Sequence, residues 1–169
     1  MLIESADPMT DLLIRAETPG DHPAIDILID RVFGPGRYSK VSERLREGNT
    51  PIPGVGMVAL EGGVRIGCAR MWPVMVGETA VAFLGPLAVE ADARRGGLGA
   101  ELVDRACLAA AAAGFPAVVL VGDLPFFSRV GFAVAPGVRL PGPCDPRRVL
   151  VRELVAGAAD ALKGMARVP

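Results

Sequence analysis

The chain has 169 residues, a length that indicates one domain at roughly 150 residues per domain. Hydrophobic residues make up 51% and charged residues 22%, a globular composition that excludes an intrinsically disordered protein. The formal net charge of −1 excludes a generally basic surface, so we expect neither a nucleic acid nor a membrane as partner.

The first eleven residues are expected to form an N-terminal tail, followed by a single domain over residues 12–169. Residues 1–11 carry acids and lack the cationic start of a signal peptide. The longest uncharged run, residues 106–122, contains Gly114 and Pro116 and falls short of a membrane span. We therefore expect a soluble, cytoplasmic protein.

Residues 12–47 predict one strand followed by two helices. The strand is expected at residues 12–16, and the Thr-Pro-Gly-Asp sequence at 18–21 is a typical helix start. Apolar residues then recur at spacings of three and one as far as Phe33, which predicts one apolar helix face. The polar segment 37–47 is predicted to be a short second helix.

The middle of the chain predicts three strands. Residues 56–60 and 64–76 read as a hairpin around the Glu-Gly-Gly turn at 61–63. Residues 79–89 form a further apolar strand. Because Pro86 lies within that strand and has no N–H to donate, we expect a bulge or a local splay there.

The last third of the chain alternates helices and strands. The strongest predicted helix covers residues 98–113 and ends at Gly114. Residues 157–165 are expected to be weakly helical or irregular. The order of elements predicts an α+β fold with a mixed sheet and helices on its faces. The remaining predicted elements are strands at 117–121, 131–135 and 149–154 and a short helix at 124–129.

The cysteines and the histidine exclude two kinds of site. Cys68, Cys107 and Cys144 lie far apart, form no CxxC pair and are odd in number, and His22 is the only histidine. A structural zinc site and a disulfide framework are therefore excluded, and we expect no metal.

The segment with the clearest chemistry follows the strand that ends at residue 89. Residues 94–100 read Arg-Arg-Gly-Gly-Leu-Gly-Ala and lead directly into the strongest helix. Free backbone N–H groups and the positive end of the helix dipole attract an anion there, and glycines let a phosphate approach the backbone. The pattern predicts phosphate or pyrophosphate binding.

Two of the three ligand classes that use such a loop fit poorly. A P-loop needs a Lys-Ser or Lys-Thr pair, and none follows here. A dinucleotide-binding turn starts well with Gly97 and Gly99, but Leu102 replaces its third glycine and the loop after Val89 is too long. Asp123 imitates the ribose-binding acid of that fold, so a dinucleotide-binding domain stays an alternative. Coenzyme A is the third class.

The same loop matches the Arg/Gln-x-x-Gly-x-Gly/Ala pyrophosphate loop of the GNAT superfamily of N-acetyltransferases. Residues 87–89 resemble the family's strand that holds the pantetheine arm. Residues 126–132, Phe-Phe-Ser-Arg-Val-Gly-Phe, resemble the aromatic-Tyr-x-x-x-Gly-Phe element after its fifth strand. The resemblance spans about residues 12–155. With Gly-Asp at 122–123, it is nearest to a small, poorly characterised bacterial branch.

This resemblance implies a GNAT fold, with a mixed central sheet and helices on both faces. It implies transfer of an acetyl group from acetyl-CoA to an amine by direct attack in a ternary complex, with backbone N–H groups near residues 87–89 polarising the carbonyl. The cofactor-binding residues that it implies are Leu87, Ala88, Val89, Arg94, Arg95, Gly96, Gly97, Leu98, Gly99, Ala100, Phe126, Phe127 and Arg129.

The chain departs from the family pattern at the proton donor. In many members a tyrosine protonates the departing thiolate, but Phe127 stands at the matching position and has no proton to give. Candidate substitutes are Tyr38, which is the only tyrosine, Ser128, and water.

The identity of the general base is also undecided, because residues 81–89 contain no carboxylate. Asp123, Glu43 and Glu90 are candidates beside an ordered water, although Asp123 could instead cap the short helix after it. The missing tyrosine also favours an alternative hypothesis, in which the protein is a non-catalytic CoA-binding or regulatory module.

The partner implied by the resemblance is an amine acceptor, either a small molecule or a peptide. Segments 34–50 and 135–148 are expected to shape its pocket, and their mixed charge selects no acceptor. Edge strands near the C-terminus offer a route to a homodimer.

Overall fold

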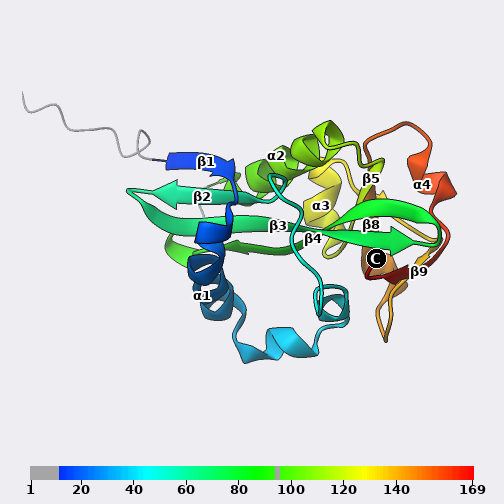
Figure 1. Cartoon of the computed structure of the whole chain (residues 1–169), viewed down its shortest axis with the longest axis horizontal. Helices are drawn as coiled ribbons and strands as arrows, with labels where there is room; N and C mark the ends of the chain where they lie inside the picture. Colours follow the sequence, from blue (N-terminus) through cyan, green and yellow to red (C-terminus); the bar gives the residue numbers. More distant parts are fainter. Residues whose placement is uncertain (1–11, 94–95) are drawn as a thin grey trace, which may run out of the picture.

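The computed structural model describes residues 12–93 and 96–169. A mixed sheet runs through the molecule, with β1 to β4 consecutive and antiparallel, β5 parallel to β4, and β8 antiparallel to β5 (Figure 1). The strands are β1 (Leu12–Ala16), β2 (Met57–Glu61), β3 (Val64–Val76), β4 (Thr79–Val89), β5 (Ala117–Val121), β6 (Ala133–Val134), β7 (Val138–Arg139), β8 (Val149–Glu153) and β9 (Gly164–Arg167). The helices are α1 (His22–Phe33), α2 (Leu98–Ala112), α3 (Leu124–Phe127) and α4 (Ala158–Ala161).

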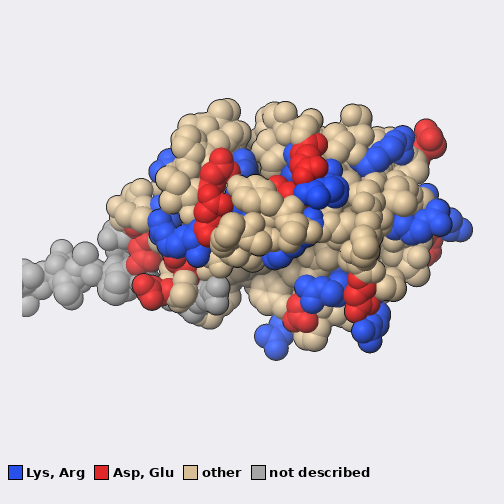
Figure 2. All heavy atoms as spheres, turned by 90° about the horizontal axis from the view of Figure 1, so that it is seen from below, with Lys and Arg blue, Asp and Glu red and all other residues tan. Residues whose placement is uncertain are grey.

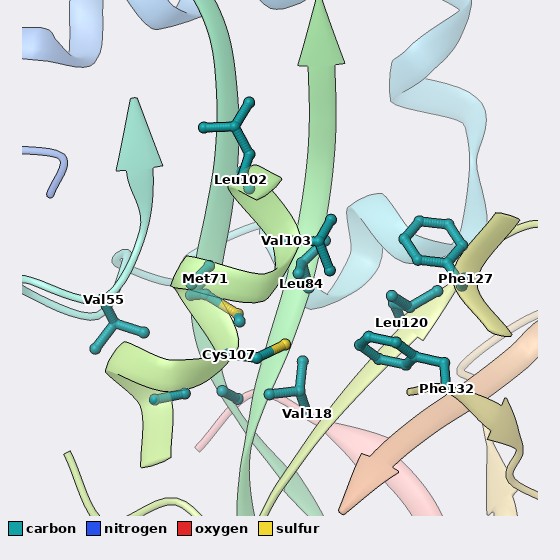
Figure 3. Packing of buried hydrophobic residues seen from close by; sticks show 14 of the residues in the cluster. Val55, Met71, Leu84, Leu102, Val103, Cys107, Val118, Leu120, Phe127 and Phe132 are labelled. Atoms are coloured by element: carbon teal, nitrogen blue, oxygen red, sulfur yellow. The ribbon is translucent and has the colours of Figure 1, made fainter. Parts of the chain in front are cut away.

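Helices cover both faces of the sheet, which confirms the predicted α+β architecture. On one face, Leu102, Val103 and Cys107 of α2 share one buried cluster with Met71 of β3 and Val118 of β5 (Figure 3). On the other face, the buried stripe of α1 packs in one cluster with Val58 and Leu60 of β2, Cys68 of β3 and Ala88 of β4. Figure 1 shows α1 and the segment that follows it on the side of the sheet opposite α2.

The first turn before α1 is fixed by a buried carboxylate. Asp21 is fully buried, accepts a hydrogen bond from the Thr18 N–H at 2.8 Å, and pairs with Arg15 and Arg65, each at 2.7 Å. The Arg15 guanidinium in particular holds the pKa of Asp21 well below its usual range. The helix then ends at Gly34, whose φ of +71° suits glycine.

The segment predicted as a second helix is not α-helical. Residues 35–45 form two 3-10 turns, Pro35–Ser39 and Val41–Leu45. Only Glu43 and Leu45 of these turns are buried. A longer helix would therefore have no continuous apolar face to pack against the sheet, and the prediction for residues 37–47 was wrong.

The C-terminal segment contains a strand that the sequence pattern did not reveal. Residues 157–165 were expected to be weakly helical or irregular, and the short α4 agrees with this, but α4 is followed by β9, which pairs with the end of β3 and with β7. The predicted strand at 131–135 is reduced to the two residues of β6. Among the described residues, no helix has the length and apolar composition needed to cross a membrane.

Candidate active site

An open cavity of about 810 Å³ lies where β4 and β5 separate. The two parallel strands pair only at Ala82 with Val118 and at Phe83 with Val119. Beyond these pairs, residues 84–87 and residues 120–123 form opposite walls of the cavity. The sheet itself therefore splits at this point and leaves an edge of β4 without a partner strand among the described residues.

A bulge in β4 shapes this edge. Leu84 lies opposite Met71 and Leu87 opposite Ala69, so that Gly85 and Pro86 together face the single residue Arg70. The Gly85–Pro86 peptide bond is cis. The bulge expected at Pro86 is thereby confirmed.

Trp72 ties this bulge to β3. Its indole N–H donates a hydrogen bond to the carbonyl of Gly85 at 2.6 Å, and both residues are buried. Since a buried carbonyl needs a partner, this bond stabilises the bulged conformation.

The backbone N–H of Leu87 faces the open edge. The Glu90 N–H donates to the carbonyl of Ile66 and therefore points towards β3. N–H groups of an extended antiparallel strand point alternately to its two sides. Ala88 thus points its N–H towards β3, whereas Leu87 points its N–H towards the cavity.

The N-terminus of α2 lies beside the same strand. Gly97 is its N-cap with φ of +94°, and no atom of the described residues lies within 4 Å of the position that a Cβ would take on Gly96 or Gly97. At Gly99 that position is 3.5 Å from the Phe126 ring and 3.9 Å from the Leu87 side chain. The start of α2 and the β4 edge of the cavity are therefore neighbours.

The other predicted cofactor-binding residues fall into different environments. Arg94 and Arg95 lie outside the described residues. Leu98 is buried in the core beneath α2, and Ala88 packs towards α1 on the opposite face. Arg129 is exposed and lies outside the cavity, while Val89 and Ala100 are half-buried.

Phe127 has an apolar environment. It is 9% exposed, and its ring contacts those of Phe126 and Phe132 edge to face, with centroids 4.8 and 5.7 Å apart. Figure 3 shows Phe127 and Phe132 on either side of Leu120. One side of Phe127 lines the cavity and presents only hydrocarbon to it.

Two of the three predicted catalytic residues do not line the cavity. Tyr38 is 51% exposed, and its hydroxyl accepts a hydrogen bond from Arg37 at 2.6 Å. Ser128 is exposed, and its hydroxyl donates to the carbonyl of Pro125 at 3.2 Å.

Asp123 does line the cavity, at the end of β5. It occupies the N-cap position of α3, but its side chain makes no capping hydrogen bond. Among the residues that the structure describes, Asp123 is the one carboxylate on the cavity wall. The alternative bases are engaged elsewhere, Glu43 with Arg46 and Glu90 with Arg31.

A group of cations that the sequence pattern did not reveal meets in this cavity. Arg37 lies in the first 3-10 turn, Lys40 lies between the two turns and Arg46 directly follows the second, whereas Arg148 directly precedes β8. Burial lowers the pKa of Arg46, and the carboxylate of Glu43 acts in the opposite direction. The sequence had indicated only that segments 34–50 and 135–148, which contain these cations, shape the acceptor pocket.

Comparisons with known proteins agree with this architecture. Residues 24–132 match the acetyltransferase (GNAT) family. The uncharacterized N-acetyltransferase YhbS of Escherichia coli (strain K12) is 36% identical over 126 residues, which cover 73% of this chain and 75% of YhbS. The chain belongs to the GNAT family. As a GNAT member it is an acyltransferase.

Solved GNAT structures share the fold. The crystal structure of YhbS from Escherichia coli in complex with CoA has a TM-score of 0.81 and 31% identity, covering 98% of this chain and 94% of that one. A GNAT family acetyltransferase from Brucella melitensis in complex with acetyl-CoA has a TM-score of 0.62 and 26% identity, covering 88% and 97%. The GNAT fold predicted from the glycine loop is confirmed.

Proposed function

We propose that residues 12–169 form a single domain that transfers an acetyl group from acetyl-CoA to an amine. The observation that carries this proposal is the split between β4 and β5, whose cavity adjoins the glycine-rich start of α2. The two relatives described above are bound to CoA and to acetyl-CoA, which supports the same ligand here.

The residues present fit coenzyme A. Gly96 and Gly97 leave open space at the start of a 15-residue helix, where free N–H groups and the helix dipole favour a pyrophosphate. The unpaired edge of β4 suits an extended pantetheine arm, whose amides need backbone partners. Acetyl-CoA supplies an activated thioester at the end of this arm.

Leu87 and Asp123 have the two chemical roles in this proposal. The Leu87 N–H donates a hydrogen bond to the acetyl carbonyl oxygen, where negative charge develops during attack. Asp123 accepts a proton from the incoming amine, directly or through one water. A C–N bond forms as the C–S bond breaks, and the CoA sulfur leaves with a proton from water, because the hydroxyls of Tyr38 and Ser128 lie outside the cavity.

Release of the CoA thiol on addition of an amine tests this function. The Asp123→Asn enzyme should lose about 10²-fold in kcat, the lower range for a general base, while its acetyl-CoA affinity stays unchanged. Asp160→Asn is the matched control, because Asp160 is exposed on α4 and lies outside the cavity. Equal kcat in both variants would contradict the role of Asp123. Turnover should be unchanged in Tyr38→Phe, and a loss would contradict water as the proton source.

A second candidate function is a non-catalytic CoA-binding module. The hydrocarbon surface of Phe127 at the usual tyrosine position favours it. Such a module would bind acetyl-CoA but release no thiol with any amine, whereas an enzyme would show release with some acceptor.

A further inference from the structure

The cavity between β4 and β5 carries an excess of positive charge. Four cationic side chains line it, those of Arg37, Lys40, Arg46 and Arg148, against the single carboxylate of Asp123. Figure 2, which views the face of the segment after α1, shows basic and acidic side chains interspersed over the rest of that surface. The excess is therefore local to the cavity and does not belong to a broad basic face.

Two of these cations form no ion pair within 4.0 Å in the part of the chain that the structure describes. Neither Arg148 nor Lys40 forms an ion pair there, although the Lys40 ammonium lies 4.6 Å from the centre of the Phe33 ring. Arg148 is exposed on the cavity wall. The carboxylate of Asp145 interacts with Arg148 through its charge but pairs directly with Arg147, so the Arg148 guanidinium can bind an anion that enters the cavity.

Arg46 reaches the bulge of β4. Its Nε and Nη2 bind the carboxylate of Glu43 at 3.1 and 3.0 Å, which leaves Nη1 on the other side of the guanidinium. Nη1 lies 3.1 Å from the position that a Cβ would take on Gly85. A charged donor therefore lies against Gly85, two residues before Leu87, whose N–H would bind the thioester carbonyl.

These cations are separate from the anion site at the start of α2. Neither Gly96 nor Gly97 lines the cavity, whereas the cations come from the opposite wall and from the start of β8. The phosphates of CoA would bind at α2, so they do not account for the charge in the cavity. The remaining component of the reaction is the acceptor.

We propose that the acceptor is a small primary amine that carries a carboxylate, as a free amino acid does. Arg148 binds the carboxylate, because a planar guanidinium matches a carboxylate through two parallel hydrogen bonds, and Arg46 adds a single hydrogen bond from Nη1. The amine then points towards Asp123 and the β4 edge. This assignment rests on the proposed acetyltransferase function and adds the substrate class to it.

Matched acceptor sets test the assignment. Each set contains an amino acid, its primary amide and the decarboxylated amine, for example arginine, argininamide and agmatine. The wild-type enzyme should acetylate the acid with a kcat/KM roughly tenfold or more above that of the amide and the amine, the value of a charge-assisted hydrogen bond. A peptide-directed enzyme would accept the amide as well as the acid.

Two variants test whether Arg148 and Arg46 cause the preference for the acid over the amide. Arg148→Gln should reduce the acid-to-amide ratio of kcat/KM about tenfold, and Arg46→Lys, which keeps a charge beside Glu43, should reduce it less. Arg147→Gln is the matched control, because Arg147 is the sequence neighbour, pairs with Asp145, and lies outside the cavity. It should leave the ratio unchanged.

Equal kcat/KM for acid and amide, or an unchanged ratio in Arg148→Gln, would overturn the assignment while leaving the acetyltransferase function intact. If no acceptor releases thiol, the proposed function fails, and binding decides the substrate class. Calorimetric titration of the CoA-saturated protein should then still show the acid bound about tenfold more tightly than the amide, with the preference lost in Arg148→Gln. Equal affinity for the acid and the amide would overturn the assignment of the substrate class.

Discussion

Replacing Trp72 by phenylalanine should destabilise the protein and weaken acetyl-CoA binding together. The change removes the indole N–H that binds the Gly85 carbonyl at 2.6 Å and leaves that carbonyl buried without its donor. An unsatisfied buried carbonyl costs about 2 kcal/mol, and the smaller ring adds about 1 kcal/mol through the space that it leaves.

The expected loss of about 3 kcal/mol corresponds to a Tm lower by roughly 6 to 12 °C for a domain of this size. Thermal unfolding followed by circular dichroism measures it. Because the bulge would no longer hold Leu87 in place, the variant should also lose one hydrogen bond to the ligand, a roughly fivefold higher Kd for acetyl-CoA by calorimetry.

Phe132→Leu is the control for general destabilisation. Phe132 is 3% exposed and belongs to the core cluster beneath α2 rather than to that of Trp72, and it does not line the cavity. This variant should lower Tm without changing the Kd for acetyl-CoA. If Trp72→Phe kept the wild-type Kd, the bulge would not shape the binding edge, and the role given to Leu87 would be refuted.

Three further predictions concern buried groups. The pKa of Asp21 is lower in the native state than in the unfolded state, so the ionised carboxylate stabilises the fold fully above about pH 4, and this stabilisation is lost as the pH falls below that value. Asp21→Asn should lower the free energy of unfolding by about 2–3 kcal/mol at pH 7. Denaturant titrations at several pH values should show that the pH dependence is lost in this variant. Burial raises the pKa of Cys68 and of Cys107 to about 12, so mass spectrometry should find both unalkylated by iodoacetamide at pH 8 in the native protein and modified after unfolding. Gly122→Ala would place a Cβ 2.5 Å from the Phe127 ring, and a midpoint shift in urea equivalent to about 1–3 kcal/mol is expected; an unchanged midpoint would contradict this packing.

Local rules in the sequence predicted the elements that frame the site. The strands now seen as β3 and β4 were predicted with their observed bounds, because apolar runs flank a short glycine turn. The bulge followed from Pro86, which cannot donate to a ladder. Helix α2 was predicted to within one residue, because an apolar stripe lies between two glycines with positive φ.

Long-range placement accounts for what the sequence did not reveal. Strand β9 has no alternating pattern and exists because it pairs with β3 and β7. Arg46 and Arg148 are about a hundred residues apart in sequence, so only the fold brings them to one cavity. Tyr38 was a candidate because it is the only tyrosine, whereas its position outside the cavity depends on a 3-10 turn.

Calorimetric titration with acetyl-CoA, with NAD as the competing ligand, tests the central claim most directly. The wild-type protein should bind acetyl-CoA at one site and show no heat with NAD. Gly97→Glu should weaken acetyl-CoA binding tenfold or more, because a carboxylate at the start of α2 repels the pyrophosphate. Binding of NAD in preference to acetyl-CoA, or an unchanged affinity in Gly97→Glu, would contradict the assignment of this site.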